Sequence, residues 1–328
     1  MFTRLLVPLD RSPLAEQAIG QAAAIARAAQ AEIDLVLVHQ PLSFEGFADA
    51  PWSAEQWNDE HKYLESIVDE LTSGSSVPAT RAVLRGETVE MICQRAWDIG
   101  ADLIVMTSHG RTGVSRAWLG SVADGVLRRS SIPVLLLRPV ETKTGRHAAH
   151  HPFKRMLVPL DGSALSTDIL SSAISLARCS GARVTLVRVV QPVPVMTLDA
   201  GIPYAFSPLA QDYGLTDRLL ADANAQLEEL ARRYTGEGNV TVDAQAVLAG
   251  YVAQGIIDFA RSHESDVIAM STHGRGASRL LMGSVADKVL RGSGLPMLLH
   301  RPIEVNESAQ TTMPFASGES VRPPDVSF

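Results

Sequence analysis

The sequence predicts an α/β fold of two tandem, doubly wound domains, each built on a five-stranded parallel sheet, and two observations point to it. Three motifs occur once in each half and in the same order: Leu-Val-Pro-Leu-Asp at 6–10 and 157–161, His-Gly-Arg at 109–111 and 273–275, and Gly-Ser-Val-Ala-Asp at 120–124 and 283–287. Continuously apolar strands also alternate with helices in each half, which is typical of a parallel sheet covered on both faces. A period near half the chain lies within the usual size of one domain and far above that of solenoid repeats.

The first half predicts five strands with helices between them. A short apolar strand at 5–9 is followed by Ser12 as a helix N-cap and Pro13 at the first helical position. The remaining strands are expected at 33–38, 79–84, 103–106 and 133–137. Helices are expected from Pro13 to about Ala29, over 55–72 with an end at Gly74, over 87–99 with an end at Gly100, and from Gly120 onward, with 41–54 as a loop.

The second half repeats this order. Its strands are expected near 155–160, 183–189, 240–247, 266–270 and 296–300. The division of the chain that follows is a first domain at 1–140, a polar linker at 141–153, a second domain at 154–303 and a disordered tail at 304–328. The last strand of each half is short and apolar, so we expect these two edges to pair and make the halves an intramolecular pseudo-dimer.

Composition restricts the classes of partner. A net charge of −7 and a pI near 5.7 argue against a general affinity for nucleic acid or an anionic membrane, since both require a basic surface. No signal-peptide pattern follows Met1, and no apolar run approaches the roughly 18 residues of a membrane span. Cys93 and Cys179 stand at non-equivalent places in the two halves, so reduced thiols in a cytoplasmic protein are expected rather than a disulfide or a metal site.

The chemistry-bearing residues stand where strands end. In an open α/β sheet, ligands bind beyond the carboxyl ends of the strands, where the strand order reverses. Asp10 ends the first strand, Thr107 to Gly110 end the fourth, and Gly120-Ser121 open a helix whose N–H groups and hydroxyl suit phosphate oxygens. Asp10 has two readings, as a cap of the following turn or as an acceptor for a base or sugar, and both can hold together.

Other reactive-looking residues are weaker candidates. His109 and His273 lack the companions of a catalytic triad or a metal site in the sequence, so no chemical role is assigned to them. The histidines of the linker are interpreted as solvated, and the loop arginines as solvated or in contact with phosphate. The Walker lysine motif is absent, and with it the strong machinery for phosphoryl transfer, so no catalytic residue is assigned.

The ordered set of motifs resembles the universal stress protein family, specifically its tandem members, over residues 3–140 and 154–302. The nucleotide-binding branch of that family has the pattern G-x2-G-x9-G-[ST] after the fourth strand. The first half has Thr107-x2-Gly110-x9-Gly120-Ser121, and the second has Ser271-x2-Gly274-x8-Gly283-Ser284. Both therefore lack the leading glycine, and the second loop is one residue shorter, which removes up to about 3.3–3.6 Å of reach.

The resemblance implies a Rossmann-like fold of the adenine-nucleotide α-hydrolase type, with ATP, AMP or ADP as ligand and Mg²⁺ as a companion of the phosphates. The residues it implies for nucleotide binding in the first half are Pro8, Leu9, Asp10, Gln40, Met106, Thr107, Gly110, Gly120, Ser121 and Val122. In the second half they are Pro159, Leu160, Asp161, Val189, Met270, Ser271, Gly274, Gly283, Ser284 and Val285. Gln40, matched here with Val189, is polar where the family more often has an apolar residue.

The resemblance thus implies a cytoplasmic stress-response protein that acts by nucleotide-dependent binding and association, as a homo-oligomer or as a pseudo-dimer. Two alternatives stay open: an interaction scaffold without nucleotide, which the missing leading glycines favour, and a slow ATP hydrolase. The nine residues between Gly110 and Gly120, against eight between Gly274 and Gly283, further predict tighter ATP binding in the first half.

Overall fold

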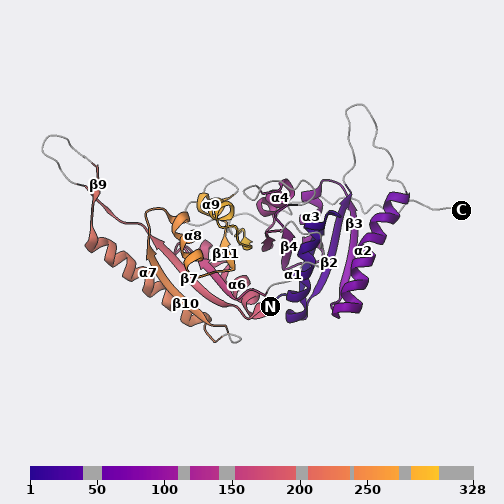
Figure 1. The fold of residues 1–328 in the computed structure, drawn as a ribbon, viewed down its shortest axis with the longest axis horizontal. Coiled ribbons are helices and arrows are strands. Elements are labelled where there is room, and N and C mark those ends of the chain that lie inside the picture. Colours follow the sequence, from indigo (N-terminus) through magenta and orange to yellow (C-terminus); the bar gives the residue numbers. More distant parts are fainter. Residues whose placement is uncertain are drawn as a thin grey trace, which may run out of the picture.

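A ten-stranded sheet runs through both halves of the protein (Figure 1). The structure, a computed structural model, describes residues 1–39, 54–109, 119–139, 152–196, 206–236, 240–272 and 282–302. Within these residues the strand order is β10-β7-β6-β11-β12-β5-β4-β1-β2-β3, and every neighbouring pair is parallel except β12 with β5. Each half therefore contributes five parallel strands, which confirms the fold class.

The first half forms the expected elements in the expected order. They are β1 (Arg4–Leu9), α1 (Pro13–Ala29), β2 (Glu32–His39), α2 (Ala54–Ser75), β3 (Ala79–Arg85), α3 (Thr88–Asp98), β4 (Leu103–Thr107), α4 (Ser121–Arg129) and β5 (Val134–Leu137). Ser12 caps α1, with its Oγ accepting the N–H of Ala15 at 3.1 Å, and Pro13 opens the helix as predicted. The expected end of α2 at Gly74 is wrong, because the helix continues to Ser75.

The second half repeats this plan with one addition. Its elements are β6 (Arg155–Pro159), α5 (Ala164–Thr167), α6 (Leu170–Ser180), β7 (Arg183–Val190), β8 (Pro194–Met196), β9 (Phe206–Gln211), α7 (Tyr213–Tyr234), β10 (Val242–Leu248), α8 (Val252–Ser262), β11 (Val267–Ser271), α9 (Ser284–Gly292) and β12 (Met297–His300). The antiparallel pair β8–β9, with β9 at the outer end of this half in Figure 1, has no counterpart among the predicted strands. The helix after β6 is also divided into α5 and α6, which the periodicity did not predict.

Two hydrophobic layers cover the sheet. Helices α1, α2, α6 and α7 contribute to one buried cluster, and α3, α4, α8 and α9 contribute to the other. Neighbouring side chains of β1 alternate between the clusters, with Leu5 and Val7 in the first and Leu6 in the second. Helices on both faces of a parallel sheet are the defining feature of a doubly wound domain.

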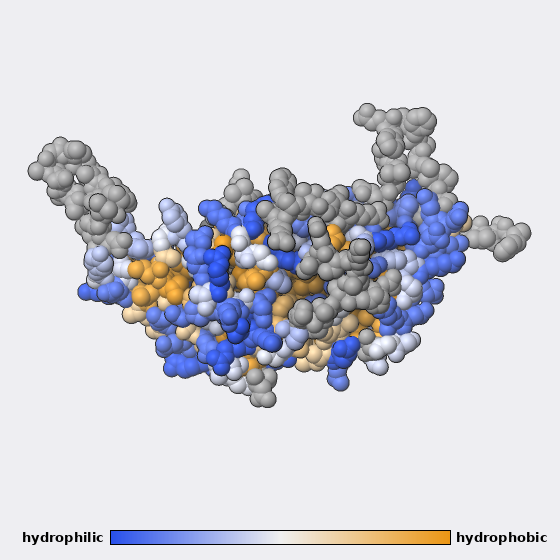
Figure 2. Space-filling model, viewed as in Figure 1, coloured by the Kyte–Doolittle hydropathy of each residue, from blue (hydrophilic) through white to orange (hydrophobic). Residues whose placement is uncertain are grey.

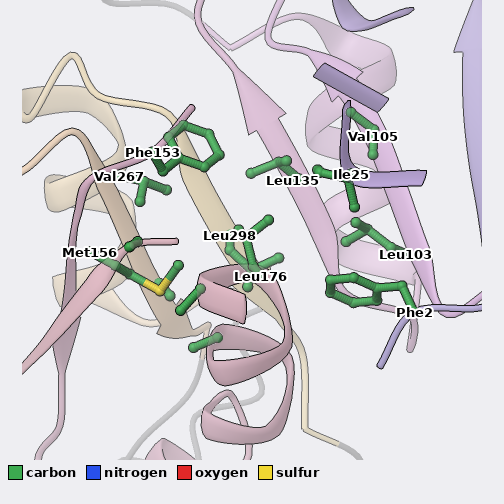
Figure 3. Close-up of a cluster of buried hydrophobic side chains, with 14 of the residues drawn as sticks. Phe2, Ile25, Leu103, Val105, Leu135, Phe153, Met156, Leu176, Val267 and Leu298 are labelled. Atoms are coloured by element: carbon green, nitrogen blue, oxygen red, sulfur yellow. The ribbon is translucent and has the colours of Figure 1, made fainter. Parts of the chain in front are cut away.

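The junction between the halves is built from the two short edge strands, as predicted. Strands β5 and β12 pair antiparallel, with Leu135 opposite Leu298, and both of these side chains are fully buried. Figure 3 shows residues of both halves, among them Ile25 and Leu103 from one and Leu176 and Val267 from the other, within one buried cluster. The hydrophobic core is therefore continuous across the junction.

Several other expectations concern residues that the structure describes. No helix among them is long and apolar enough to cross a membrane. Cys93 and Cys179 are free, and burial raises the pKa of Cys93 to about 11, so its thiol is a poor nucleophile. Phe153, expected in the linker, is buried in the core. The rest of the expected linker, apart from Pro152, and the expected tail lie outside the described residues.

Candidate functional site

A cavity of about 690 Å³ opens at the carboxyl ends of the central strands of the second half. Nine of the residues expected to bind nucleotide in this half line it: Pro159, Leu160, Asp161, Val189, Met270, Ser271, Gly283, Ser284 and Val285. The tenth, Gly274, lies outside the described residues. They come from the ends of β6, β7 and β11 and from the start of α9, so the fold brings together residues that are up to 126 positions apart in the sequence.

One wall of this cavity is apolar and reaches the surface. Val189, Ile256 and Met270 belong to it, and it extends to Leu219 of α7, which is 41% exposed. Figure 2 shows apolar surface over the part of the molecule that Figure 1 labels α7 and β7. A planar, weakly polar group such as a purine ring would be desolvated well against this wall.

The N-terminus of α9 also lines the cavity. Gly283, Ser284, Val285 and Ala286 all line the cavity. Gly283 makes no side-chain cap, and the first backbone bond of the helix runs from the N–H of Asp287 to the carbonyl of Gly283. The N–H groups of the first turn therefore have no partner within the helix, which suits them to an anionic group.

Asp161 also lines the cavity, and its carboxylate already holds the turn after β6. Its Oδ1 accepts the backbone N–H of Ser163 at 2.9 Å and the Ser163 hydroxyl at 2.6 Å. In the first half, Asp10 Oδ1 accepts the N–H of Ser12 at 2.9 Å in the same way. The first of the two readings of Asp10, as a cap of the following turn, is thus present in the structure.

The first half places its predicted residues at the equivalent strand ends. Pro8 and Leu9 lie at the end of β1, Met106 and Thr107 at the end of β4, and Gly120, Ser121 and Val122 at the start of α4. Gln40 and Gly110 lie outside the described residues. Arg111, Arg116, Arg275, Arg279 and His273 also lie outside them.

Both candidate phosphate loops are closed at their base by the same backbone hydrogen bond. Gly120 donates its N–H to the carbonyl of Ser108 at 2.8 Å, and Gly283 donates to that of Thr272 at 2.7 Å. A Cβ atom on Gly120 would lie 3.0 Å from the Ser108 oxygen, although its φ of −62° suits any residue. This glycine therefore permits the loop closure itself, and a side chain there would disturb the backbone before it met a ligand.

The sheet register corrects one expected equivalence. Val36 pairs with Pro8, and Val187 pairs with Pro159, so Val36 and Val187 occupy equivalent positions. Two residues further along, Val189 is the counterpart of Val38 rather than of Gln40, which corresponds to Gln191. The expected matching of Gln40 with Val189 is therefore wrong by two residues of the sheet register.

The structure adds lining residues that motif reasoning missed. They are Ser166, Val187, Arg188, Val190, Gln191, Leu219, Val252, Ile256, Thr272 and Ala286. The end of β7 could have been found from the sequence, since β7 neighbours β6 in any doubly wound order. The α7 and α8 contributions depend on packing and leave no local motif.

The hydroxyl groups that replace the leading glycines behave differently in the two halves. Thr107 Oγ1 donates to the carbonyl of His109 at 2.8 Å. Ser271 is 6% exposed, and among the described residues its buried Oγ has no hydrogen-bond partner.

His109 lies just after the end of β4. Its Nδ1 lies 3.0 Å from Ser108 Oγ. Among the described residues, no group of three or more histidine, cysteine, aspartate or glutamate side chains could hold a metal ion.

Comparison with known proteins gives consistent matches over both halves. A model of the universal stress protein family matches residues 1–138 and 152–301. A universal stress protein of Methanocaldococcus jannaschii is 28% identical over 148 residues, covering 45% of this chain and 81% of that protein. One of Mycobacterium tuberculosis is 28% identical over 207 residues, covering 61% of this chain and 62% of its own length. The crystal structure of a universal stress protein from Archaeoglobus fulgidus superposes with a TM-score of 0.66 at 19% identity, over 91% of this chain and 98% of that one.

Proposed function

Since the chain belongs to the universal stress protein family, we propose that it binds an adenine nucleotide, ATP or AMP, and acts in stress response by nucleotide-dependent association. The proposed sites are the cavity beyond β6 and β11 and its counterpart beyond β1 and β4. The observation that carries the proposal is the convergence of nine predicted residues on one cavity.

The lining of the cavity offers a surface for each part of a nucleotide. The apolar side chains of Val189, Ile256 and Met270 suit the base, the Asp161 carboxylate can accept hydrogen bonds from hydroxyl or amino groups, and the first turn of α9 suits the phosphates. Its volume of about 690 Å³ is within the usual range for sites of small ligands, roughly 300–1,000 Å³. Mg²⁺ would then be held mainly by phosphate oxygens and water, as is usual for this ion beside nucleotides.

The first test is to find the ligand. Freshly purified protein is denatured, and the released small molecules are separated by chromatography and identified by mass. ATP or AMP near one or two equivalents per chain is the expected result. In parallel, calorimetric titration with ATP, with and without Mg²⁺, measures affinity in protein stripped of ligand.

A matched pair of variants tests the location. Val189→Phe fills the base end of the second cavity, and Val38→Phe makes the same change at the equivalent position of the first half. Each should remove one ATP site and leave the melting temperature of the ligand-free protein within a few degrees of the parent. Unchanged titration curves for both variants would show that the nucleotide binds elsewhere.

The competing function is an interaction scaffold without nucleotide, favoured by Thr107 and Ser271 in place of the leading glycines. The same two experiments decide between the functions: no nucleotide in the fresh preparation and no heat of ATP binding would support the scaffold. A steady-state assay with labelled ATP separates slow hydrolysis from plain binding, since a defined product well above background would reveal an enzyme.

A further inference from the structure

Two arginines cross the junction in opposite directions. Arg138 follows β5, and its Nη2 donates a hydrogen bond to the carbonyl of Leu290 in the last turn of α9. Arg301 follows β12, and its Nη1 donates to the carbonyl of Arg128 in the last turn of α4. Both arginines precede a proline at equivalent positions of the repeat, so the two contacts form a reciprocal pair.

The accepting carbonyls are those that a helix leaves without partners. The last four carbonyls of an α-helix have no N–H within the helix to bind. Backbone bonds from Ser130 and Ser293 occupy the carbonyls of Val126 and Val289. Arg138 occupies the carbonyl one residue beyond Val289, and Arg301 occupies the carbonyl two residues beyond Val126. A cation at this end of a helix also interacts favourably with the helix dipole.

The charges of the two helices are close across the junction. The hydrogen bond to Asp124 raises the pKa of Arg128 on α4, and Asp287 on α9 adds to that rise. His300, at the end of β12, lies with its Nε2 3.1 Å from the carbonyl of Ser131, just beyond α4. Each helix therefore ends in contact with the other half of the protein.

The opposite ends of these same helices face the candidate nucleotide sites. The first residues of α9 line the cavity, and α4 begins at the equivalent point of the first half. A nine-residue helix is only about 13–14 Å long, so it moves as one short rod. Phosphate would bind at one end of each rod, and an arginine from the other half holds the other end.

We propose that Arg138 and Arg301 are positioning residues that complete the nucleotide site of the opposite half: Arg138 acts on the second-half site through α9, and Arg301 on the first-half site through α4. The inference rests on the proposed function. Hydrogen bonds from the first turn to phosphate require donor–acceptor distances of about 2.7–3.2 Å, so a helix that slides or tilts loses them. The arginine contributes both this restraint and a favourable charge at the far end of the helix.

The test uses the full chain and ATP. In the Val38→Phe background, which retains the second-half site, Arg138→Met should weaken ATP binding about five- to tenfold, and Arg301→Met should change it less than twofold. In the Val189→Phe background, which retains the first-half site, Arg301→Met should weaken ATP binding about five- to tenfold, and Arg138→Met should change it less than twofold. Methionine keeps an apolar stem of similar length, whereas Arg138→Lys and Arg301→Lys keep the charge and a donor, so the lysine variants should recover part of the affinity.

A measurement without ligand separates this inference from the proposed function. Hydrogen exchange of the ATP-free chain should be faster in α9 for Arg138→Met and faster in α4 for Arg301→Met. If the parent does not bind ATP, the proposed function is overturned, and with it the effect of each arginine on the ATP affinity of the opposite half. Faster exchange of α9 in Arg138→Met and of α4 in Arg301→Met would then still show that each arginine holds a helix of the opposite half. Equal effects of one arginine on both sites, an effect on its own half, or uniform exchange changes in both helices would overturn the inference. Should a methionine variant fail to fold, the same comparison is made with the lysine variants.

Discussion

At the scale of single residues, His300 links the junction to pH. Burial lowers the pKa of His300 below its ordinary value of 6.5, although the bond to Ser131 and the charge of Asp168 raise it in part. The carbonyl of Ser131 can only accept, so Nε2 carries the proton of the neutral ring. The equivalent residue of the first half is Leu137, which makes a leucine substitution a natural comparison.

We predict that His300→Leu makes the protein less sensitive to acid. The unfolded chain binds a proton at His300 near pH 6.5, and the folded chain binds it at lower pH. Below pH 6.5 the unfolded state therefore holds more protons, and the free energy of unfolding falls as the pH falls. Melting temperatures between pH 5 and 7.5 should decline more steeply in the parent than in the variant; parallel curves would contradict the prediction.

At the scale of elements, a buried ion pair in the first half has an uncharged counterpart in the second. Arg95 of α3 makes two hydrogen bonds to Asp34 of β2, at 3.0 and 2.6 Å, and Asp34 is 2% exposed. The equivalent residues of the second half are Phe259 and Thr185. The equivalent positions thus hold a charged pair in one half and uncharged side chains in the other, as expected if a paired buried charge and uncharged residues give similar stability.

We predict that the residues of the second half can replace Asp34 and Arg95 together but not one at a time. Arg95→Phe alone leaves the Asp34 carboxylate buried without its cation and should cost about 3 kcal/mol of unfolding free energy. The double change Asp34→Thr with Arg95→Phe should recover most of this loss. A double-mutant cycle from urea unfolding measures the coupling, with the exposed pair of Arg261 and Asp258 as a control of small effect. Additive losses in the cycle would contradict the prediction.

The elements also show what could be predicted from the sequence and what could not. The strands of the large sheet, the helices of the first half and the Ser12 cap follow local rules of periodicity and capping, so the sequence predicts them to within a few residues. The β8–β9 pair is not predicted from the sequence, because Pro192 and Pro194 indicate a loop in the segment that forms β8. Strand-end motifs predicted much of the cavity lining, whereas Leu219 and the junction arginines depend on contacts between distant segments that leave no local signal.

At the scale of the whole molecule, the halves share one sheet and one core. β12 pairs with β5, and α6 packs against α1 beside that junction. In one half alone, Leu135 and the unpaired edge of β5 would be exposed to water. The expected difference in ATP affinity between the halves stays a prediction: the described ends of both loops are closed by the same backbone hydrogen bond.

The final prediction concerns the half-chain. Residues 1–140 expressed alone should dimerise through β5, because the β5 edge of a second copy can replace β12. Without such a dimer the half-chain should be markedly less stable than the full chain, because the apolar side chains of β5 would then be exposed to water. Sedimentation over a range of concentrations measures the association, and urea unfolding measures the stability. Leu135→Glu in the half-chain is the control: it places a charge in the pairing surface and should abolish the dimer. A stable monomer of residues 1–140 would show that the junction joins two self-sufficient domains rather than completing their core.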